Sequence, residues 1–306
     1  MADAGEEVDY EGLGEGFPLH INMIAGALAG ISEHAVMFPV DVIRTRMQIL
    51  SASPAATYSG VTEALRRISS AEGGRALWRG VASVVMGAGP AHAVYFGTYE
   101  VVKEATGGNR SGHQFASTAF AGASATIASD AFMNPFDVVK QRMQMHGSTY
   151  RSVLTCASDV YKREGLRAFY VSYPTTLAMT VPFTAVQFST YEWAKEVLNP
   201  SGSYSPTTHA VAGGFAGAVA AAVTNPLDVA KTLLQTRGNS SDAVIRKASG
   251  MLTAFKIIHE REGLKGFARG LSPRVLTFMP SNALCWLSYE GFRWFLRDQT
   301  REKFVG

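Results

Sequence analysis

The sequence is poor in charged residues and nearly free of cysteine. Aspartate, glutamate, lysine and arginine together make up only 17% of its 306 residues, against roughly 25% in ordinary soluble domains. Its two cysteines, Cys156 and Cys285, are too few for disulfides to stabilise a chain of this length, and an apolar content of 47% excludes intrinsic disorder. Because the mean hydropathy is only +0.05, the composition is typical of membrane helices that keep one polar face toward a water-filled interior.

Six windows of the sequence are long, apolar and nearly free of charge. A helix needs about 20 apolar residues to cross a bilayer, and most of these windows reach that length: 19–40, 80–99, 111–136, 168–191, 199–227 and 275–289. The last window is short, and we expect the Arg274 side chain to extend it by reaching the membrane surface. The windows predict six membrane-spanning helices, and an even number places both termini on one side.

The loops after the first, third and fifth windows are strongly basic. Residues 42–79, 138–167 and 229–274 hold 21 of the 28 lysines and arginines but only seven acids. By the positive-inside rule, such loops face the compartment in which the membrane potential is negative.

Three motifs each occur three times, in the same order and 91 to 98 residues apart. The first is Pro-x-Asp-x-x-(Lys/Arg) with a glutamine nine residues after the proline, the second is Glu-Gly, and the third is Tyr-Glu-x-x-(Lys/Arg). They begin at Pro39, Pro135 and Pro226, at Glu72, Glu164 and Glu262, and at Tyr99, Tyr191 and Tyr289. Such a repeat predicts three copies of one two-helix unit.

A proline inside a spanning helix removes one backbone hydrogen bond and kinks the helix. Kinks at Pro39, Pro135 and Pro226 would bring the ends of three helices together on the side of the basic loops. The acid and base that follow each proline can then pair between neighbouring helices: Asp41 with Lys140, Asp137 with Lys231, and Asp228 with Arg44. Three surface ion pairs, each contributing about 0–1 kcal/mol, are the alternative, but ionisable residues at the ends of spans usually face the bundle interior. The pattern therefore favours a gate.

Together, these motifs resemble the signature of the mitochondrial carrier family over about residues 17–298. The resemblance implies an all-α membrane protein of the inner mitochondrial membrane, with six transmembrane helices in three tandem two-helix repeats. It further implies threefold pseudosymmetry, short amphipathic helices on the matrix side, and termini toward the intermembrane space. The corresponding segments are an acidic tail at 1–16, repeats at 17–110, 111–200 and 201–298, and a tail at 299–306. Two residues depart from the pattern: Leu233 replaces the arginine of the first two repeats, and Val171 stands where the family usually has Gly or Arg.

The resemblance also implies the parts of two gates that exclude each other, as alternating access requires. On the matrix side, Gln48, Gln144 and Gln235 would brace the three ion pairs. On the cytoplasmic side, the third motif would supply the acids, bases and bracing tyrosines of the opposing gate: Glu100, Glu192, Glu290, Lys103, Lys195, Arg293, Tyr99, Tyr191 and Tyr289.

The side chains inside the windows favour a cation as cargo. The even-numbered windows carry no lysine or arginine at mid-depth, which carriers of nucleotides, phosphate or carboxylates would need. His34 and Asp130 each lie seven residues before a signature acid, and Met37 and Met133 lie four residues before it, so all four are near the helix face of those acids. His92 falls on the corresponding face of its own window. Imidazole, thioether and carboxylate together suit a borderline divalent metal, although single histidines and methionines also serve as packing residues.

Within the family, four segments resemble mitoferrin-type iron carriers: 33–39, 89–96, 178–183 and 279–283. The resemblance implies that His34, His92 and His209 occupy histidine positions tied to iron. It places Gly87 and Met179 at selectivity positions, with Thr180 in place of an asparagine, and it adds Asn282 as a further contact.

We therefore predict a carrier that imports ferrous iron as its substrate and holds no resident cofactor. An enzyme is disfavoured, because the sequence has neither a phosphate loop nor a nucleophile with a base at a plausible depth. The expected partners are inner-membrane lipids, including cardiolipin at the matrix-side helix ends, with no nucleic acid and a monomeric state. Other cargoes stay open: copper, zinc, manganese, chelated iron or an organic cation, as does a non-transporting or proton-leak homologue.

Overall fold

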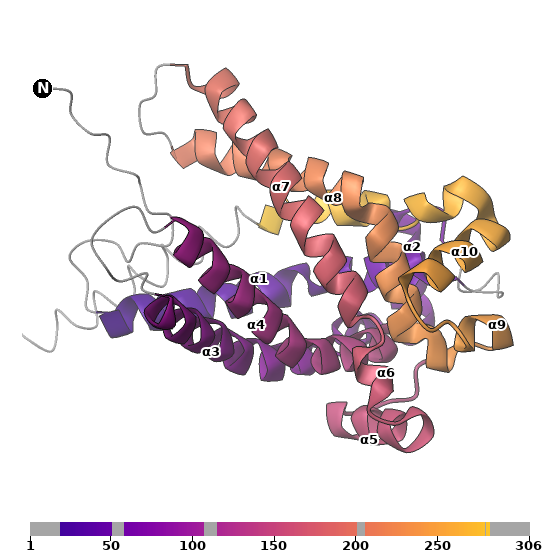
Figure 1. Ribbon diagram of the computed structural model, residues 1–306. Coiled ribbons are helices and arrows are strands. Elements are labelled where there is room, and N and C mark those ends of the chain that lie inside the picture. Colours follow the sequence, from indigo (N-terminus) through magenta and orange to yellow (C-terminus); the bar gives the residue numbers. More distant parts are fainter. Residues whose placement is uncertain (1–18, 51–57, 107–114, 201–205, 279, 282–306) are drawn as a thin grey trace, which may run out of the picture. The chain divides into compact units, whose positions relative to one another are not determined.

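The computed structural model describes residues 19–50, 58–106, 115–200, 206–278 and 280–281 (Figure 1). The chain divides into two units, one formed by Met1–Val36 with Pro280–Gly306 and the other by Met37–Met279. Every contact described below lies within the second unit. The described residues are mainly helical and contain no strand.

Long helices cover most of the first five predicted windows, and most of the sixth window, 275–289, lies outside the described residues. The long helices are α1 (Leu19–Gln48), α3 (Val81–Ala105), α4 (Phe115–Gln144), α7 (Tyr173–Leu198) and α8 (Pro206–Thr236), and residues 271–278 are also helical. Pro39, Pro135 and Pro226 lie inside α1, α4 and α8, as the predicted kinks in these helices require. These three helices extend eight or nine residues past the apolar windows, because the signature charges pair with neighbouring helices and do not end the helix.

One helix in the described part of the chain, Thr208–Asn239, is long and apolar enough to cross a membrane by length and composition alone. The other windows are low in charge but contain glycine, serine, threonine and histidine, which lower their mean hydropathy. The six-span arrangement therefore stays a prediction.

Three short helices follow the long helices α1, α4 and α8 at equivalent places: α2 (Val61–Glu72), α5 (Val153–Glu164) and α10 (Met251–Glu262) (Figure 1). Each ends at the glutamate of a Glu-Gly motif, and the next residue, Gly73, Gly165 or Gly263, has a positive φ of 83°, 75° or 64°. Only glycine adopts this backbone conformation readily, and it terminates a helix. Short connecting turns complete the set: η2 (Gly74–Trp78), α6 (Arg167–Tyr170), η3 (Arg237–Asn239), α9 (Ala243–Arg246) and η4 (Gly263–Ala268).

Each short helix packs its apolar face on the end of the long helix before it. The resulting cores are equivalent and centre on Ile43 with Ile68, on Val139 with Val160, and on Leu234 with Ile258. The same kind of apolar core thus holds each short helix on its long helix and fixes the ends of α1, α4 and α8.

The free thiol of Cys156 lies in the middle one of these cores and is fully buried. Burial disfavours the thiolate and raises the pKa of Cys156 to about 12. We expect negligible labelling by a maleimide at pH 7.5 in a Cys285→Ala variant, and a rate that rises about tenfold per pH unit above that. Rapid labelling at pH 7.5 that stops in Cys156→Ala would contradict this, and labelling after denaturation is the positive control.

Candidate functional site

The signature acids and bases of α1, α4 and α8 form three ion pairs, each between two different helices. Lys140 Nζ lies 2.5 Å from Asp41, and Lys231 Nζ lies 3.2 Å from Asp137. The third pair closes the set: Arg44 Nη2 lies 2.5 Å from Asp228 Oδ2, and its Nε donates to the same oxygen at 3.1 Å. The three pairs are those predicted from the sequence, and together they join each helix to both of the others.

Two of the three predicted glutamine braces are formed. Gln48 Nε2 donates to Asp228 at 2.5 Å, and Gln48 Oε1 accepts a hydrogen bond from the Thr232 hydroxyl at 2.8 Å. Gln144 repeats this arrangement, because its Nε2 donates to Asp41 at 3.4 Å and its Oε1 accepts from Thr45 at 2.8 Å. Each threonine lies four residues after a signature acid, and sequence reasoning did not assign it a role.

The third brace is absent, although its glutamine is present. Gln235 is fully buried, and neither its side-chain nitrogen nor its side-chain oxygen has a hydrogen-bond partner. The residue four positions after Asp137 is Gln141 rather than threonine, and its Oε1 is likewise buried without a partner. The longer amide replaces the hydroxyl that orients the bracing glutamine at the other two interfaces, so the pair of Asp137 with Lys231 is unbraced.

Replacing Gln141 with threonine is expected to complete this brace. One gained hydrogen-bond pair contributes about 1 kcal/mol, which corresponds to a rise of roughly 2–4 °C in the midpoint of thermal unfolding. The midpoint in detergent measures this, and the reverse exchange, Thr45→Gln, is the matched control and should lower it. A lower midpoint for Gln141→Thr would show that the Gln141 side chain already stabilises the fold more than the completed brace would.

Arginines link each Glu-Gly motif to the next long helix. Buried Arg46 binds both carboxylate oxygens of Glu72, at 2.5 and 2.9 Å, and donates its Nε–H to the Gln144 carbonyl at 2.8 Å. Arg142 does the same with Glu164 and the Gln235 carbonyl. Burial acts to raise the pKa of the Glu72 carboxyl, but the hydrogen bonds and charge of Arg46, together with the charge of Arg79, hold that pKa below its usual value.

The two departures from the family pattern, Leu233 and Val171, fall in different repeats. The glutamate of each Glu-Gly motif therefore keeps at least one arginine partner. In the third repeat Leu233 replaces the arginine, and Arg269 takes over by pairing with Glu262 and donating to the Met47 carbonyl at 3.1 Å. In the second repeat Val171 stands at the position of Arg269, and Glu164 relies on Arg142. Only Glu72 has arginines at both positions, with Arg79 at 3.0 Å.

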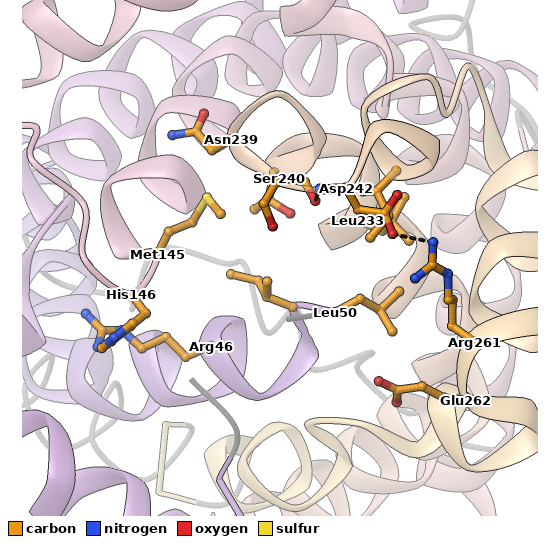
Figure 2. Close-up of a pocket in the computed structure, with 14 residues that line it drawn as sticks. Arg46, Leu50, Met145, His146, Leu233, Asn239, Ser240, Asp242, Arg261 and Glu262 are labelled. Atoms are coloured by element: carbon orange, nitrogen blue, oxygen red, sulfur yellow. Dashed lines mark hydrogen bonds and ion pairs between the residues drawn. The ribbon is translucent and has the colours of Figure 1, made fainter. Parts of the chain in front are cut away.

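Leu233 also forms part of the wall of a cavity of about 420 Å³ (Figure 2). Arg46 and His146 lie on one side of this cavity and Arg261 and Glu262 on the other, with Leu50 between them. In the first two repeats the residue at this position, Arg46 or Arg142, pairs with the glutamate of its own repeat, whereas Leu233 and Glu262 both line this cavity.

Arg274 does not extend to the membrane surface, and that expectation was wrong. Its side chain is 3% exposed, and its Nη1 lies 3.5 Å from Asp228 Oδ2. The buried carboxylate of the signature acid faces this guanidinium and balances its charge inside the protein.

The cytoplasmic-gate residues are not joined in the same way. Lys195 Nζ lies 3.8 Å from Glu192 on the same helix, and Lys103 Nζ lies 5.6 Å from the centre of the Tyr99 ring. Within the ranges that the structure describes, Glu100, Lys103, Glu192 and Lys195 make no ion pair between helices. Tyr289, Glu290 and Arg293 lie outside the described residues.

His92 and Asp130 lie at the same level of two neighbouring helices. The Ser129 hydroxyl on α4 donates to the Ala91 carbonyl on α3 at 3.0 Å, which aligns the residues that follow each of them. His92 is exposed, and its Nδ1 lies 2.8 Å from the Ala88 carbonyl oxygen. Because Nδ1 must then carry the proton, the neutral ring keeps a free lone pair on Nε2. Asp130 is half-buried and has no hydrogen bond or ion pair with any residue that the structure describes.

Other predicted cargo contacts have neighbours of their own. Gly87 is buried where a Cβ would lie 2.8 Å from the Met133 sulfur, so it permits α3 and α4 to pack closely. Thr180 donates to the Thr176 carbonyl at 3.1 Å, and the Met179 sulfur lies 3.7 Å from Arg274 Nη2.

The remaining predicted cargo contacts are His209, Met37, His34 and Asn282. His209 Nδ1 lies 2.6 Å from the Tyr191 hydroxyl, next to a predicted cytoplasmic-gate brace. Met37 is half-buried, the side chain of His34 is not described, and Asn282 lies outside the described residues. The described part of the chain contains no cluster of three His, Cys, Asp or Glu side chains able to hold a metal.

Long helices joined in a ring by ion pairs, with three equivalent short helices, are the arrangement expected of a membrane carrier built from three repeats. Three consecutive segments, 16–110, 111–202 and 202–300, each match the family model described as "Mitochondrial carrier protein". The chain belongs to the mitochondrial carrier family, whose members are transporters rather than enzymes and reside in the mitochondrial inner membrane.

Several curated relatives match nearly the whole chain. Human Mitoferrin-1 is 45% identical over 98% of this chain and 90% of its own length, and human Mitoferrin-2 is 44% identical over 97% and 83%. Mitochondrial RNA-splicing protein MRS4 of Saccharomyces cerevisiae is 48% identical over 95% of this chain and 96% of its own.

Proposed function

We propose that this carrier imports ferrous iron into the mitochondrial matrix by alternating access between two gates. The ring of three ion pairs between α1, α4 and α8 supports the proposal most directly. The described residues of the opposing gate make no ion pair between helices. One network is thus closed while the described part of the other is not, as mutually exclusive gates require.

The proposed architecture is the one that the repeats predict. Repeats 17–110, 111–200 and 201–298 would each contribute two of six spans around a threefold pseudo-axis, between tails 1–16 and 299–306. The basic loops with α2, α5 and α10 would face the matrix, and both termini would face the intermembrane space. We also propose that the carrier acts as a monomer, contacts cardiolipin at the matrix-side helix ends and binds no nucleic acid.

The cargo proposal rests on the donor atoms that α3 and α4 place at one level. Histidines that bind metals usually donate their other ring N–H to a carbonyl oxygen, and His92 does so toward Ala88. Asp130 adds a carboxylate at the same level, and Met179 adds a thioether, so the donors suit a borderline divalent ion. His34, His209, Thr180, Gly87, Met37, Met133 and Asn282 complete the proposed contact set.

The choice of iron among divalent metals is supported by the relatives named mitoferrin. Iron would be the substrate, held weakly enough to leave, as transport requires. An inside-negative potential contributes roughly 2.3 kcal/mol per charge per 100 mV, so it would drive a divalent cation toward the matrix.

The test is uptake of ferrous iron by proteoliposomes that contain a ferrous-sensitive fluorescent chelator. We expect saturable uptake that an inside-negative potential accelerates. Manganese, zinc and copper should each reduce ferrous uptake only as far as the carrier accepts that metal. No uptake by the folded protein above protein-free liposomes would overturn the bare-ion proposal. Uptake of ferrous citrate alone would assign the cargo to chelated iron.

A further inference from the structure

Arg274 places a buried positive charge beside both the matrix gate and a proposed cargo contact. Its Nη1 lies 3.5 Å from Asp228 Oδ2, its Nη2 donates to the Thr224 hydroxyl at 2.9 Å, and the same Nη2 lies 3.7 Å from the Met179 sulfur. Arg274 thus contacts both a signature acid of the gate and a predicted cargo residue.

This charge breaks the threefold pattern. Arg274 lies four residues after Gly270, and the residues four positions after Gly80 and Ser172 in the other two repeats are Val84 and Thr176. Neither can carry a charge. Asp228 is therefore the one signature acid to which a neighbouring even-numbered span contributes a cation among the described residues.

The partners of Asp228 differ in which repeat supplies them. Arg44 and Gln48 belong to α1, so they leave Asp228 when α1 and α8 separate. Arg274 belongs to the same repeat as Asp228 and stays. Asp228 is only 3% exposed, and a buried carboxylate without a counter-ion is strongly destabilising. A retained cation therefore lowers the cost of opening this interface.

Met179 connects that cation to the cargo. A divalent ion bound near the Met179 sulfur would repel the guanidinium 3.7 Å away. The repulsion would move Arg274 toward Asp228, where it competes with Arg44 for the same oxygen.

We propose that Arg274 is a positioning residue that couples arrival of the cation at Met179 to release of Arg44 from Asp228. The inference rests on the proposed function. It identifies the interface between α1 and α8 as the part of the matrix gate that responds to cargo.

The test is ferrous iron uptake by Arg274→Gln and Arg274→Met, each alone and combined with Asp228→Asn. In the wild-type background we expect the maximal rate to fall about tenfold, because Asp228 loses the cation that it would keep in the open state. The ferrous concentration for half-maximal uptake should fall as well, because the repulsion at Met179 is gone. In the Asp228→Asn background the same changes should cost less than about threefold, since no carboxylate needs a counter-ion. Arg274→Lys, which keeps the charge, should restore most of the maximal rate.

Equal losses in both backgrounds, or an unchanged maximal rate, would overturn the inference while wild-type uptake leaves the proposed function standing. No uptake by the wild type would overturn both. Thermal unfolding of every variant checks folding. If the neutral variants fold only together with Asp228→Asn, the charge pairing is supported; if they fold in neither background, Arg274 is a packing residue and the inference fails.

Discussion

Replacing Asp130 with asparagine is expected to lower ferrous iron uptake roughly 10- to 100-fold. Asp130 is half-buried and lies level with His92, and no described side chain forms an ion pair with it. In the proposed architecture Asp130 lies within a membrane span, and a carboxylate in such a span is a functional-site hypothesis by default. The exchange removes one negative charge and almost no volume, so it separates attraction for a cation from packing. Uptake into proteoliposomes at several ferrous concentrations is the measurement.

Asp159→Asn is the matched control, because it makes the same chemical change on α5, outside the long helices. Asp159 accepts hydrogen bonds from Tyr150 and Arg163, and uptake should stay within about twofold of the wild type. Asp130→Asn should keep the midpoint of thermal unfolding, since the pair of Asp137 with Lys231 is untouched. Normal uptake by Asp130→Asn would remove Asp130 from the cargo site.

The long helices and the three ion pairs between them were largely readable in the sequence, because repetition fixes equivalent positions and helical periodicity fixes faces. The spacing of Asp41, Asp137 and Asp228 from the bases that follow them predicted all three pairs, and the structure confirms them. Glu-Gly motifs marked helix ends, since a positive φ at glycine has a strong sequence signal.

Helical periodicity predicts the face of the helix on which a residue lies, but it does not predict which neighbouring residue the side chain contacts. Arg274 was expected at the membrane surface because it borders a window, but it lies on Asp228. Gln235 was expected by symmetry to act as a brace, but Gln141 stands where the other two repeats have the threonine that orients the bracing glutamine. A comparison of the three repeats four residues after each signature acid could have found this difference. The cargo contacts stay predictions, because no helical pattern reports which donors a mobile ion meets.

The largest expected loss of stability follows removal of Glu164. Arg142 is 1% exposed, and Glu164 supplies the only carboxylate that the structure shows within reach of its guanidinium among the described residues. Leaving a buried cation without its partner costs about 3–5 kcal/mol. We therefore expect Glu164→Gln to lower the midpoint of thermal unfolding in detergent by roughly 10 °C.

Glu262→Gln is the matched control, because the third repeat has already lost its buried arginine. Leu233 occupies that position, and the remaining partner, Arg269, has 16% of its side chain exposed, so a shift of only about 1 kcal/mol is expected. The same comparison predicts a rescue. Arg142→Leu gives the second repeat the residue that the third repeat has at this position, Leu233. Replacing a buried ion pair by apolar groups is often nearly neutral. The double variant Arg142→Leu/Glu164→Gln should therefore unfold at a higher temperature than Glu164→Gln alone. If the double variant is instead the less stable of the two, the arginine must act chiefly through its hydrogen bond to the Gln235 carbonyl, and the ion pair is not what holds this repeat to the next.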